Sequence, residues 1–391
     1  MRLRTLPIFL TFFAMGFVDA MGPLAGTIQK QYSLSGFMAG LLPAFAFVAF
    51  AIFSVPGGVL AARIGKKSMM VLALALVALG VLVPSLVVPG FALLLASVFV
   101  LGVGTTFLQV AGNPIMRDVS EEGRFASNLS FAQFVKGVGS VVSTALVARL
   151  AVGELGWRRV FPVFLVLTVV TLVAVLLLKV EETRAEVPPS VGSSLSLLGV
   201  PAFGLAVLGI FLYVGAEVGM NTWLSPRLES LGLTADNLRF LGVDWGKEST
   251  VLGPTLFFVS LTVGRLLGSG ILGVMSSRAF FRVSAATGAI GVLLVFVGQP
   301  GLAVAGVVLA GLGFANIWPV LFSLTVEARP ERSAELSGLM CMAIFGGAVL
   351  PPLMGRVGDT AGLGAAFLVP LAAFAYLLAL SMRGGAPAKE A

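Results

Sequence analysis

Long apolar runs of similar length recur from one end of this chain to the other, with short polar stretches between them. A helix needs about 20 apolar residues to cross the hydrocarbon core of a bilayer. The stretches that meet this requirement are 6–29, 36–61, 68–88, 90–115, 124–150, 157–179, 201–226, 250–274, 279–298, 301–326, 334–354 and 361–382. We therefore expect an all-α integral membrane protein with twelve transmembrane helices.

Composition excludes most other classes of function. The chain of 391 residues is 58% hydrophobic and 11% charged, whereas soluble domains average about 25% charged residues. The net charge of +7 is not gathered with aromatic residues, so we expect no nucleic-acid partner. With Cys341 as the one cysteine and no histidine, an intrachain disulfide, a cysteine or histidine zinc site and Ser-His-Asp catalysis are excluded. We expect no enzyme, no cofactor and no structural metal.

The middle of the chain separates two similar halves. The polar stretch "VEETRAEVPPSVGSSLS" predicts a cytoplasmic linker at 181–200 between six-helix bundles at 1–180 and 201–391. The segments "VAGNPIMRDVSEEGRFASNLS" and "NIWPVLFSLTVEARPERSAELSG" occupy matching places in the halves. Two pseudo-symmetric bundles of this kind are typical of secondary transporters, which bind substrate near the membrane midplane and work by alternating access. No glycine-rich segment ends in Gly-Lys-Ser/Thr after a strand, so ATP-driven transport is not supported.

The positions of lysine and arginine predict the orientation. With both termini inside, cytoplasmic segments hold about 15 of these residues and outer segments about 8. This bias favours cytoplasmic termini in a multi-pass protein of the inner (plasma) membrane. We expect the lipid bilayer and a small molecule as its partners, and a monomer as its working form.

The loop between the second and third spans carries a family motif. The stretch "GGVLAARIGKK" resembles the corresponding loop of the major facilitator superfamily: Gly58, Arg63, Gly65 and the basic pair match, while Ala62 replaces the usual aspartate. The resemblance implies the major facilitator fold and a gating role for Arg63.

Five further stretches resemble the fucose–proton symporter and glucose/galactose transporter family. They are "DAMGP", "QVAGNP", "YVGAEVGMNTWL", "VGRLLGSG" and "FGGAVLPPLMGRVGD". In that family a helix 1 aspartate and a helix 4 glutamate take part in proton-coupled sugar transport. Asp19 matches the aspartate and Gln109 stands in place of the glutamate. Because glutamine cannot titrate, a two-acid mechanism does not transfer directly to this chain.

Ionisable residues inside the predicted spans are few. They are Asp19, Lys136, Glu217 and Arg265, and each costs about 2.5–3.5 kcal/mol at the bilayer centre, so it needs a cavity or a partner. Asp19 and Lys136 lie at similar depths in parallel helices, which predicts an ion pair. The pair is either a static structural contact or a coupling element that a cation disrupts. Arg265, near the end of its span, is expected to snorkel or pair within a gate.

Coupling and substrate residues follow from the same helices. We expect cation coupling at Asp19, Lys136, Glu217 and Gln109, with a proton favoured and a sodium ion at Asp19 as the alternative. A sugar needs hydroxyl partners and an aromatic face. The candidate substrate-binding residues are Gln109, Asn113, Gln133, Lys136, Glu217, Asn221, Asn316 and Trp318. Each amide is equally suited to an interhelical hydrogen bond, and Trp318 is equally suited to packing.

These features favour a cation-coupled symporter of a monosaccharide or similar polyol. Three alternatives remain open at this stage. A proton-coupled efflux antiporter could use Asp19 and Glu217 as its titrating acids. An anionic sugar acid could bind to Lys136. A non-transporting membrane receptor would bind its ligand without exchange across the bilayer.

Overall fold

The structure, a computed structural model, describes residues 6–34, 36–150, 156–183, 189–233 and 252–382. Within these ranges every regular element is a helix. Eleven of the described helical segments are long and apolar enough to cross a membrane, and a shorter apolar segment, Leu6–Ala20, begins the predicted first span. Both chain ends, which the orientation argument uses, and most of the predicted outer loop at 227–249 lie outside the described residues.

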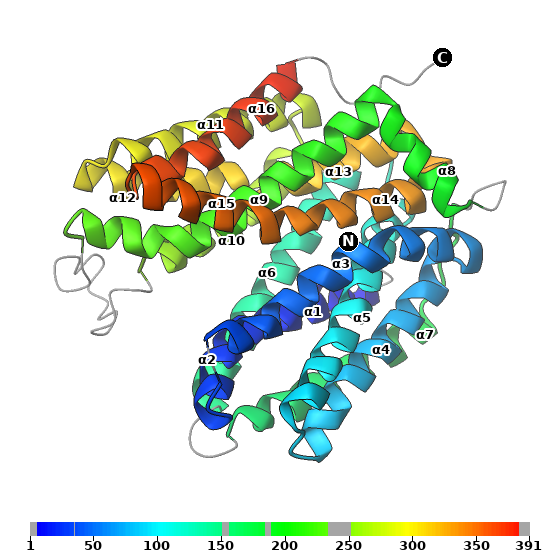
Figure 1. The fold of residues 1–391 in the computed structure, drawn as a ribbon. Helices are drawn as coiled ribbons and strands as arrows, with labels where there is room; N and C mark the ends of the chain where they lie inside the picture. The colour runs from blue at the N-terminus through cyan, green and yellow to red at the C-terminus, as the bar shows by residue number, and fades with distance from the viewer. Residues whose placement is uncertain (1–5, 35, 151–155, 184–188, 234–251, 383–391) are drawn as a thin grey trace. The chain divides into compact units, whose positions relative to one another are not determined.

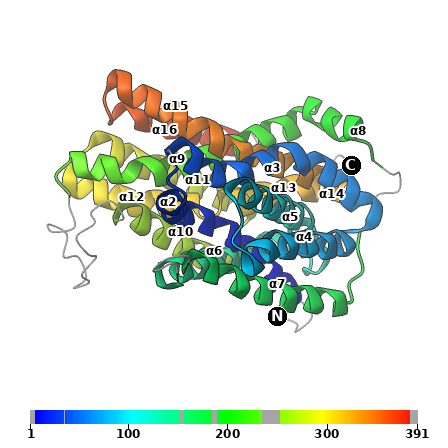
Figure 2. The same cartoon turned by 60° about the horizontal axis from the view of Figure 1, so that its bottom comes forward.

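The helices cluster into two compact units. Unit 1 comprises Met1–Gly199 together with Arg329–Met342. Its helices are α1 (Leu6–Met15), α2 (Met21–Gln31), α3 (Gly36–Ile64), α4 (Lys66–Leu86), α5 (Phe91–Asp118), α6 (Phe125–Leu150), α7 (Val160–Leu177), α8 (Val191–Ser196) and α14 (Ser333–Met342). Within this unit α4 packs between α5 and α7, and α14 lies against α3 and α5 (Figures 1 and 2).

Unit 2 comprises Val200–Ala328 and Ala343–Ala391. Its helices are α9 (Pro201–Ser230), α10 (Leu252–Ile271), α11 (Ser277–Val297), α12 (Pro300–Phe314), α13 (Ile317–Ala328), α15 (Gly346–Ala361) and α16 (Leu368–Met382). Here α11 packs between α12 and α16, while α9 contacts α10, α13, α15 and α16 (Figure 1).

The units and the predicted halves do not have the same boundaries. The linker helix α8, inside the predicted 181–200 segment, clusters with unit 1, and so does the stretch Arg329–Met342 from the predicted C-terminal bundle. The helical span Pro330–Ala361 is therefore shared between the units at Met342. The division into bundles at 1–180 and 201–391 stays a prediction.

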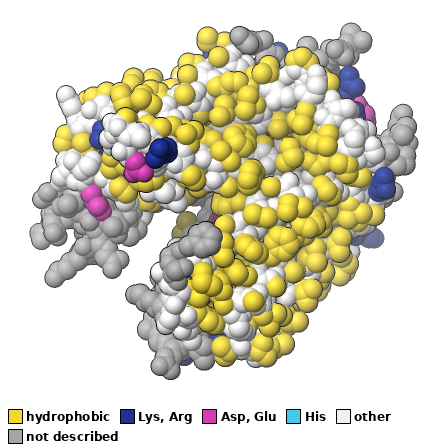
Figure 3. All heavy atoms as spheres, in the orientation of Figure 1, with side chains coloured by type: hydrophobic (Ala, Val, Ile, Leu, Met, Phe, Trp, Pro, Cys, Tyr) yellow, Lys and Arg dark blue, Asp and Glu magenta, His cyan; other side chains and the backbone are white. Residues whose placement is uncertain are grey.

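Apolar side chains lie on the outside as well as in the core. On α7, Val166 is 62% exposed, Val170 54% and Leu177 77%. Figure 3 shows hydrophobic side chains over most of the visible face, with few charged ones between them. Such a surface suits hydrocarbon as the surrounding solvent, since water would penalise exposed apolar area of this extent.

Two predicted spans are interrupted where a proline removes a helical hydrogen bond. A 3-10 segment, Gly16–Ala20, separates α1 from α2, and Pro23 has no N–H to donate to the carbonyl four residues earlier, that of Asp19. A turn at Ala315 and Asn316 separates α12 from α13, and Pro319 likewise leaves the Ala315 carbonyl without a helical donor. Both interruptions carry predicted site residues.

Candidate functional site

Asp19 lies in the 3-10 segment between α1 and α2, with its side chain exposed. The hydroxyl of Ser140 on α6 donates a hydrogen bond of 2.5 Å to the Asp19 Oδ2 atom. The same Ser140 oxygen lies 3.1 Å from the backbone carbonyl oxygen of Lys136, which is the alternative acceptor for its single hydrogen. The carboxylate is therefore fixed to the face of α6 that Lys136 and Ser140 share.

Close approach of two backbones brings Ser140 to Asp19. A Cβ atom on Gly139 would collide with the carbonyl oxygen of Phe13, and one on Gly16 would collide with the backbone of α6. The hydroxyl of Ser143 donates to the Gly16 carbonyl oxygen at 3.1 Å. The glycines of "KGVGS" and "MGFVDA" thus allow the contact that positions the acid.

Lys136 is half-buried one helical turn before Ser140. Residues four apart on a helix are neighbours on one face, so Lys136 lies on the same face of α6 as Ser140, which binds Asp19. The ion pair between Lys136 and Asp19 stays a prediction.

A buried amide pair joins α5 to α6. Gln133 donates through Nε2 to the Asn113 Oδ1 atom at 3.2 Å, and both side chains are almost completely buried. The Asn113 Nδ2 group is buried without a hydrogen-bond partner among the described residues. Buried amide donors are almost always satisfied, so this group is suited to a ligand hydroxyl or a water. Gln109, one helical turn earlier on α5, is also buried.

Helix α14, in the first half of the Pro330–Ala361 span, adds buried polar and small residues to unit 1. The Ser337 hydroxyl is buried without a hydrogen bond among the described residues. On the same helix, Gly338 lies close to Gly58 of α3. The two glycines therefore let α14 pack tightly against the C-terminal part of α3.

Unit 2 holds an ion pair between two predicted site residues. The Arg265 Nη2 atom on α10 lies 3.7 Å from the Glu217 Oε1 atom on α9, with side chains 11% and 18% exposed. Arg265, which was predicted to snorkel or to pair near the end of its span, thus pairs with Glu217, a predicted coupling residue. The hydroxyl of Tyr213, one turn before Glu217, is buried next to this pair and has no hydrogen bond of its own in the described part of the chain.

The break between α12 and α13 is bound to α10 by two hydrogen bonds. Arg265 donates through Nε to the Ala315 carbonyl oxygen at 3.4 Å. Asn316 donates through Nδ2 to the Gly264 carbonyl oxygen at 2.7 Å. A Cβ atom on Gly268 would collide with the Asn316 side chain, so glycine at this position makes room for the amide.

Two other predicted substrate residues of unit 2 differ in their surroundings. Trp318 is 5% exposed, and its ring stacks on that of Phe322 with centroids 5.9 Å apart. Asn221 is half-buried on α9, one turn after Glu217. Of the two roles that the sequence left open for Trp318, substrate contact and packing, the stacking on Phe322 is an example of packing.

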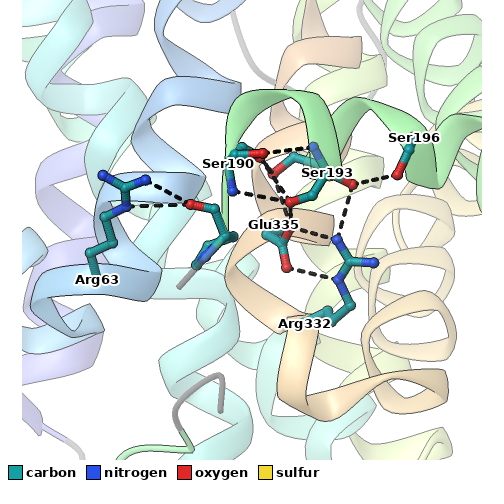
Figure 4. Close-up of polar contacts among 8 residues, drawn as sticks. Arg63, Ser190, Ser193, Ser196, Arg332 and Glu335 are labelled. Atoms are coloured by element: carbon teal, nitrogen blue, oxygen red, sulfur yellow. Dashed lines mark hydrogen bonds and ion pairs between the residues drawn. The ribbon is translucent and has the colours of Figure 1, made fainter. Parts of the chain in front are cut away.

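The predicted gating residue Arg63 binds the linker. It donates through Nη2 to the Pro189 carbonyl oxygen at 2.9 Å and through Nε at 3.3 Å (Figure 4). The linker helix α8 then meets the start of α14: the hydroxyls of Ser193 and Ser194 donate to Glu335 Oε1 at 3.2 and 3.0 Å. Arg332 donates to both Glu335 oxygens at 2.7 and 2.8 Å and to the Ser193 carbonyl oxygen at 3.0 Å (Figure 4).

The basic pair of the family loop sits at the start of α4. The Lys66 Nζ atom lies 2.5 Å from Asp118 Oδ2 of α5, and both side chains are buried. The Glu182 carboxylate accepts hydrogen bonds from the backbone N–H groups of Lys66 and Lys67 at 2.6 and 3.0 Å. An acid at a helix N-terminus satisfies free donors and complements the helix dipole, so the linker stabilises α4.

The structure therefore brings predicted site residues together within each unit. Asn113 contacts Gln133, and Glu217 contacts Arg265. Sequence reasoning missed Ser140 and Tyr213. Each stands one helical turn from a residue that was recognised, Lys136 or Glu217, and this spacing is the signal that could have found them.

Comparison with known proteins places these features in a family. The profile of the Major Facilitator Superfamily matches residues 8–252. A glucose/galactose transporter of Brucella abortus is 28% identical over 388 residues, covering 94% of this chain and 90% of its own length. The L-fucose-proton symporter of Escherichia coli is 24% identical, covering 89% and 85%. A crystal structure of the Escherichia coli fucose:proton symporter superposes with a TM-score of 0.81 at 19% identity, over 99% of this chain and 100% of that one.

Proposed function

Because this chain belongs to the major facilitator superfamily, whose members are transporters and not enzymes, we propose that it moves a monosaccharide or similar polyol across a membrane. Transport proceeds by alternating access and is coupled to the inward movement of a cation. The observation that carries the proposal is the similarity, over nearly the whole chain, to proteins named as glucose/galactose transporters and L-fucose-proton symporters.

The polar groups of unit 1 suit a sugar. The Asn113–Gln133 pair is buried among apolar helices and retains an amide donor without a partner in the described residues. Hydroxyl groups both donate and accept hydrogen bonds, so a sugar hydroxyl can satisfy the Asn113 Nδ2 group. The other candidate ligand contacts of the same proposal stay Gln109, Lys136, Glu217, Asn221, Asn316 and Trp318.

A proton is the proposed coupling ion. Asp19 is exposed and accepts one hydrogen bond from Ser140, so a proton from water can reach its carboxylate. Lys136 lies on the same face of α6 as Ser140, and its charge opposes either cation at Asp19. A proton needs the carboxylate alone, whereas sodium also needs further oxygen ligands around it. Glu217 is the second acid of the proposal, since Gln109 cannot titrate. We further propose an inner-membrane location, cytoplasmic termini and a monomeric working form.

Uptake into proteoliposomes tests the proposal. A panel of labelled hexoses is offered under an imposed proton gradient and, separately, under a sodium gradient, to the parent protein and to Asp19→Asn and Lys136→Ala. We expect accumulation of at least one hexose under the proton gradient, and its loss in Asp19→Asn while passive exchange survives.

Two results contradict the proposal. If no hexose moves under either gradient, the sugar assignment fails, and organic anions and lipophilic drugs become the next substrates to test. If accumulation follows sodium, or if Asp19→Asn accumulates sugar normally, the coupling assignment fails.

A further inference from the structure

Arg265 binds two groups of unit 2 that are far apart in the sequence. Its Nη2 atom pairs with Glu217 of α9 at 3.7 Å, and its Nε atom donates to the Ala315 carbonyl oxygen at 3.4 Å. We call residues Ala315 and Asn316 the α12–α13 joint. One guanidinium group therefore connects an acid inside the membrane with a break in a membrane-spanning helix.

The joint depends on this arginine for chemical reasons. Pro319 has no N–H, so the Ala315 carbonyl lacks its helical donor. A carbonyl left unpaired in a buried, apolar setting costs free energy. The joint lies among buried residues, and Arg265 supplies the hydrogen bond that Pro319 cannot.

A second hydrogen bond, donated from the joint to the backbone of α10, also holds α10 against the joint. Asn316 donates to the Gly264 carbonyl oxygen at 2.7 Å, and Gly268 leaves space for the amide. Residues 264 and 265 therefore bind residues 316 and 315 in a reciprocal pair of contacts. The stretch "VGRLLGSG" holds the residues needed for this arrangement: an arginine flanked by two glycines at the places where the joint approaches.

We propose that Arg265 is a positioning residue that transmits the charge of Glu217 to the α12–α13 joint. While Glu217 is ionised, the guanidinium group interacts with the carboxylate and with the Ala315 carbonyl oxygen at the same time. A proton on Glu217 removes one of these two attractions, and Arg265 then binds the Ala315 carbonyl oxygen more closely. This inference rests on the proposed role of Glu217 in cation coupling.

Other titratable groups lie on α9 and on the helices packed against it, and the test must separate them from Glu217. On α9 itself these are Tyr213, Arg227 and Glu229. On the helices packed against α9 they are Glu327 of α13, Arg356 and Asp359 of α15, and Tyr376 of α16, in addition to Arg265. Arg227 donates to carbonyl oxygens of Val295 and Phe296, and Tyr376 to that of Leu205. Arg265 is in ion-pair contact with Glu217.

Trp318 offers a reporter that needs no substrate. It lies three residues after Ala315 and stacks on Phe322, so a change at the joint alters its surroundings. The chain has four tryptophans, and fluorotryptophan labelling of the full-length protein gives each a separate fluorine NMR resonance. Trp318→Phe assigns the reporter, and Trp157 in unit 1 is the matched control.

The experiment follows the Trp318 resonance as pH is varied across the range in which the protein stays folded. We expect one transition at Trp318 and none of the same midpoint at Trp157. The transition should disappear in Glu217→Gln and in Arg265→Gln, and the double variant should behave like either single one. In Arg265→Lys, which carries its charge on one nitrogen and cannot hold both acceptors in a fixed geometry, the amplitude should fall by about half or more.

Each contrary result overturns the inference. A parent protein without a transition at Trp318 shows that the joint does not respond to charge. A transition that persists in Glu217→Gln belongs to another acid, and one that persists in Arg265→Gln or keeps full amplitude in Arg265→Lys does not pass through the guanidinium. Because the resonance is measured without sugar, failure of hexose uptake leaves these outcomes unchanged, and the two proposals fail separately.

Discussion

Ser140 donates a 2.5 Å hydrogen bond to the carboxylate of Asp19, across the contact between α6 and the 3-10 segment of the first span. Hydrogen bonds to charged groups contribute about 1.5–3 kcal/mol when shielded and less when exposed, and Asp19 is exposed. We therefore expect Ser140→Ala to reduce gradient-driven uptake several-fold, because the acid loses its fixed orientation, and Ser140→Thr to retain uptake because it keeps the hydroxyl.

The control for this prediction is Ser143→Ala. Ser143 donates to the Gly16 carbonyl oxygen in the same contact but does not touch the acid. If Ser143→Ala impairs coupled uptake as strongly as Ser140→Ala, the effect comes from packing of α6 and not from orientation of Asp19.

Gly139 tests the close approach of α6 to α1. A methyl group there meets the Phe13 carbonyl oxygen, a backbone atom that cannot move alone. Overpacking of this kind costs roughly 1–3 kcal/mol, so Gly139→Ala should lower the thermal unfolding temperature of the purified protein. Gly270→Ala on α10, where a Cβ atom meets nothing within 4 Å, should leave that temperature unchanged or raise it, since alanine favours a helix by up to about 1 kcal/mol. Equal effects of the two substitutions would contradict the assigned contact.

The Lys66–Asp118 pair is buried on both sides, with side chains 3% and 1% exposed. Removing one partner of a buried pair leaves the other charge uncompensated and costs roughly 3–5 kcal/mol. We expect Asp118→Asn to lower the unfolding temperature strongly. Arg117→Ala removes a longer, half-exposed contact to the same carboxylate at 3.9 Å and should change stability by less than about 1 kcal/mol. A near-silent Asp118→Asn would mean that Lys66 is neutralised or rehydrated without its partner.

Glu335 connects the linker helix α8 to the start of α14 by accepting from Ser193, Ser194 and Arg332. Glu335→Gln removes the charge that attracts Arg332, so the α8 contact should open more often. Hydrogen exchange of the amides of Ser193 and Ser194 should then accelerate by about tenfold or more, which corresponds to a loss of about 1.4 kcal/mol. Ser196→Ala, which removes an exposed hydrogen bond to the Ser193 carbonyl oxygen but keeps Glu335, should accelerate the exchange of the Ser193 and Ser194 amides far less than Glu335→Gln does. Unchanged exchange of α8 in Glu335→Gln would show that the acid does not hold the linker.

Apolar length alone predicted an all-α protein with repeated membrane spans, because a bilayer leaves a chain with repeated 20-residue apolar runs few other structures. The major facilitator fold was predicted from the resemblance of the loop and helix motifs to that superfamily. The interruptions at Gly16–Ala20 and at Ala315–Asn316 were not predicted as breaks. Their signals were present in Pro23 and Pro319, but a proline in a membrane helix produces a bend, a kink or a full break depending on what re-satisfies the freed carbonyl.

The contacts of the candidate site were harder to predict than its members. Their ionisable groups inside apolar spans identified Glu217 and Arg265, yet their pairing depends on how α10 is rotated about its axis against α9. A helix that is apolar on all sides has no polar face to define that rotation. The small size of Gly264 and Gly268 selects the face of α10 that packs against the joint. This role of the two glycines can be recognised only once the partner helix is known.

We expect Pro319 and Arg265 to be coupled in evolution, because the arginine supplies the Ala315 carbonyl oxygen with the hydrogen bond that the proline cannot donate. A lineage that replaced Pro319 with a residue carrying an N–H would restore the helical donor to Ala315 and relax selection on the guanidinium. A lineage that lost Arg265 first would carry an unpaired carbonyl until the proline followed. Substitutions at these two positions, 54 residues apart in the sequence, should therefore be strongly epistatic, and in related chains the proline and the arginine should appear and disappear as one character.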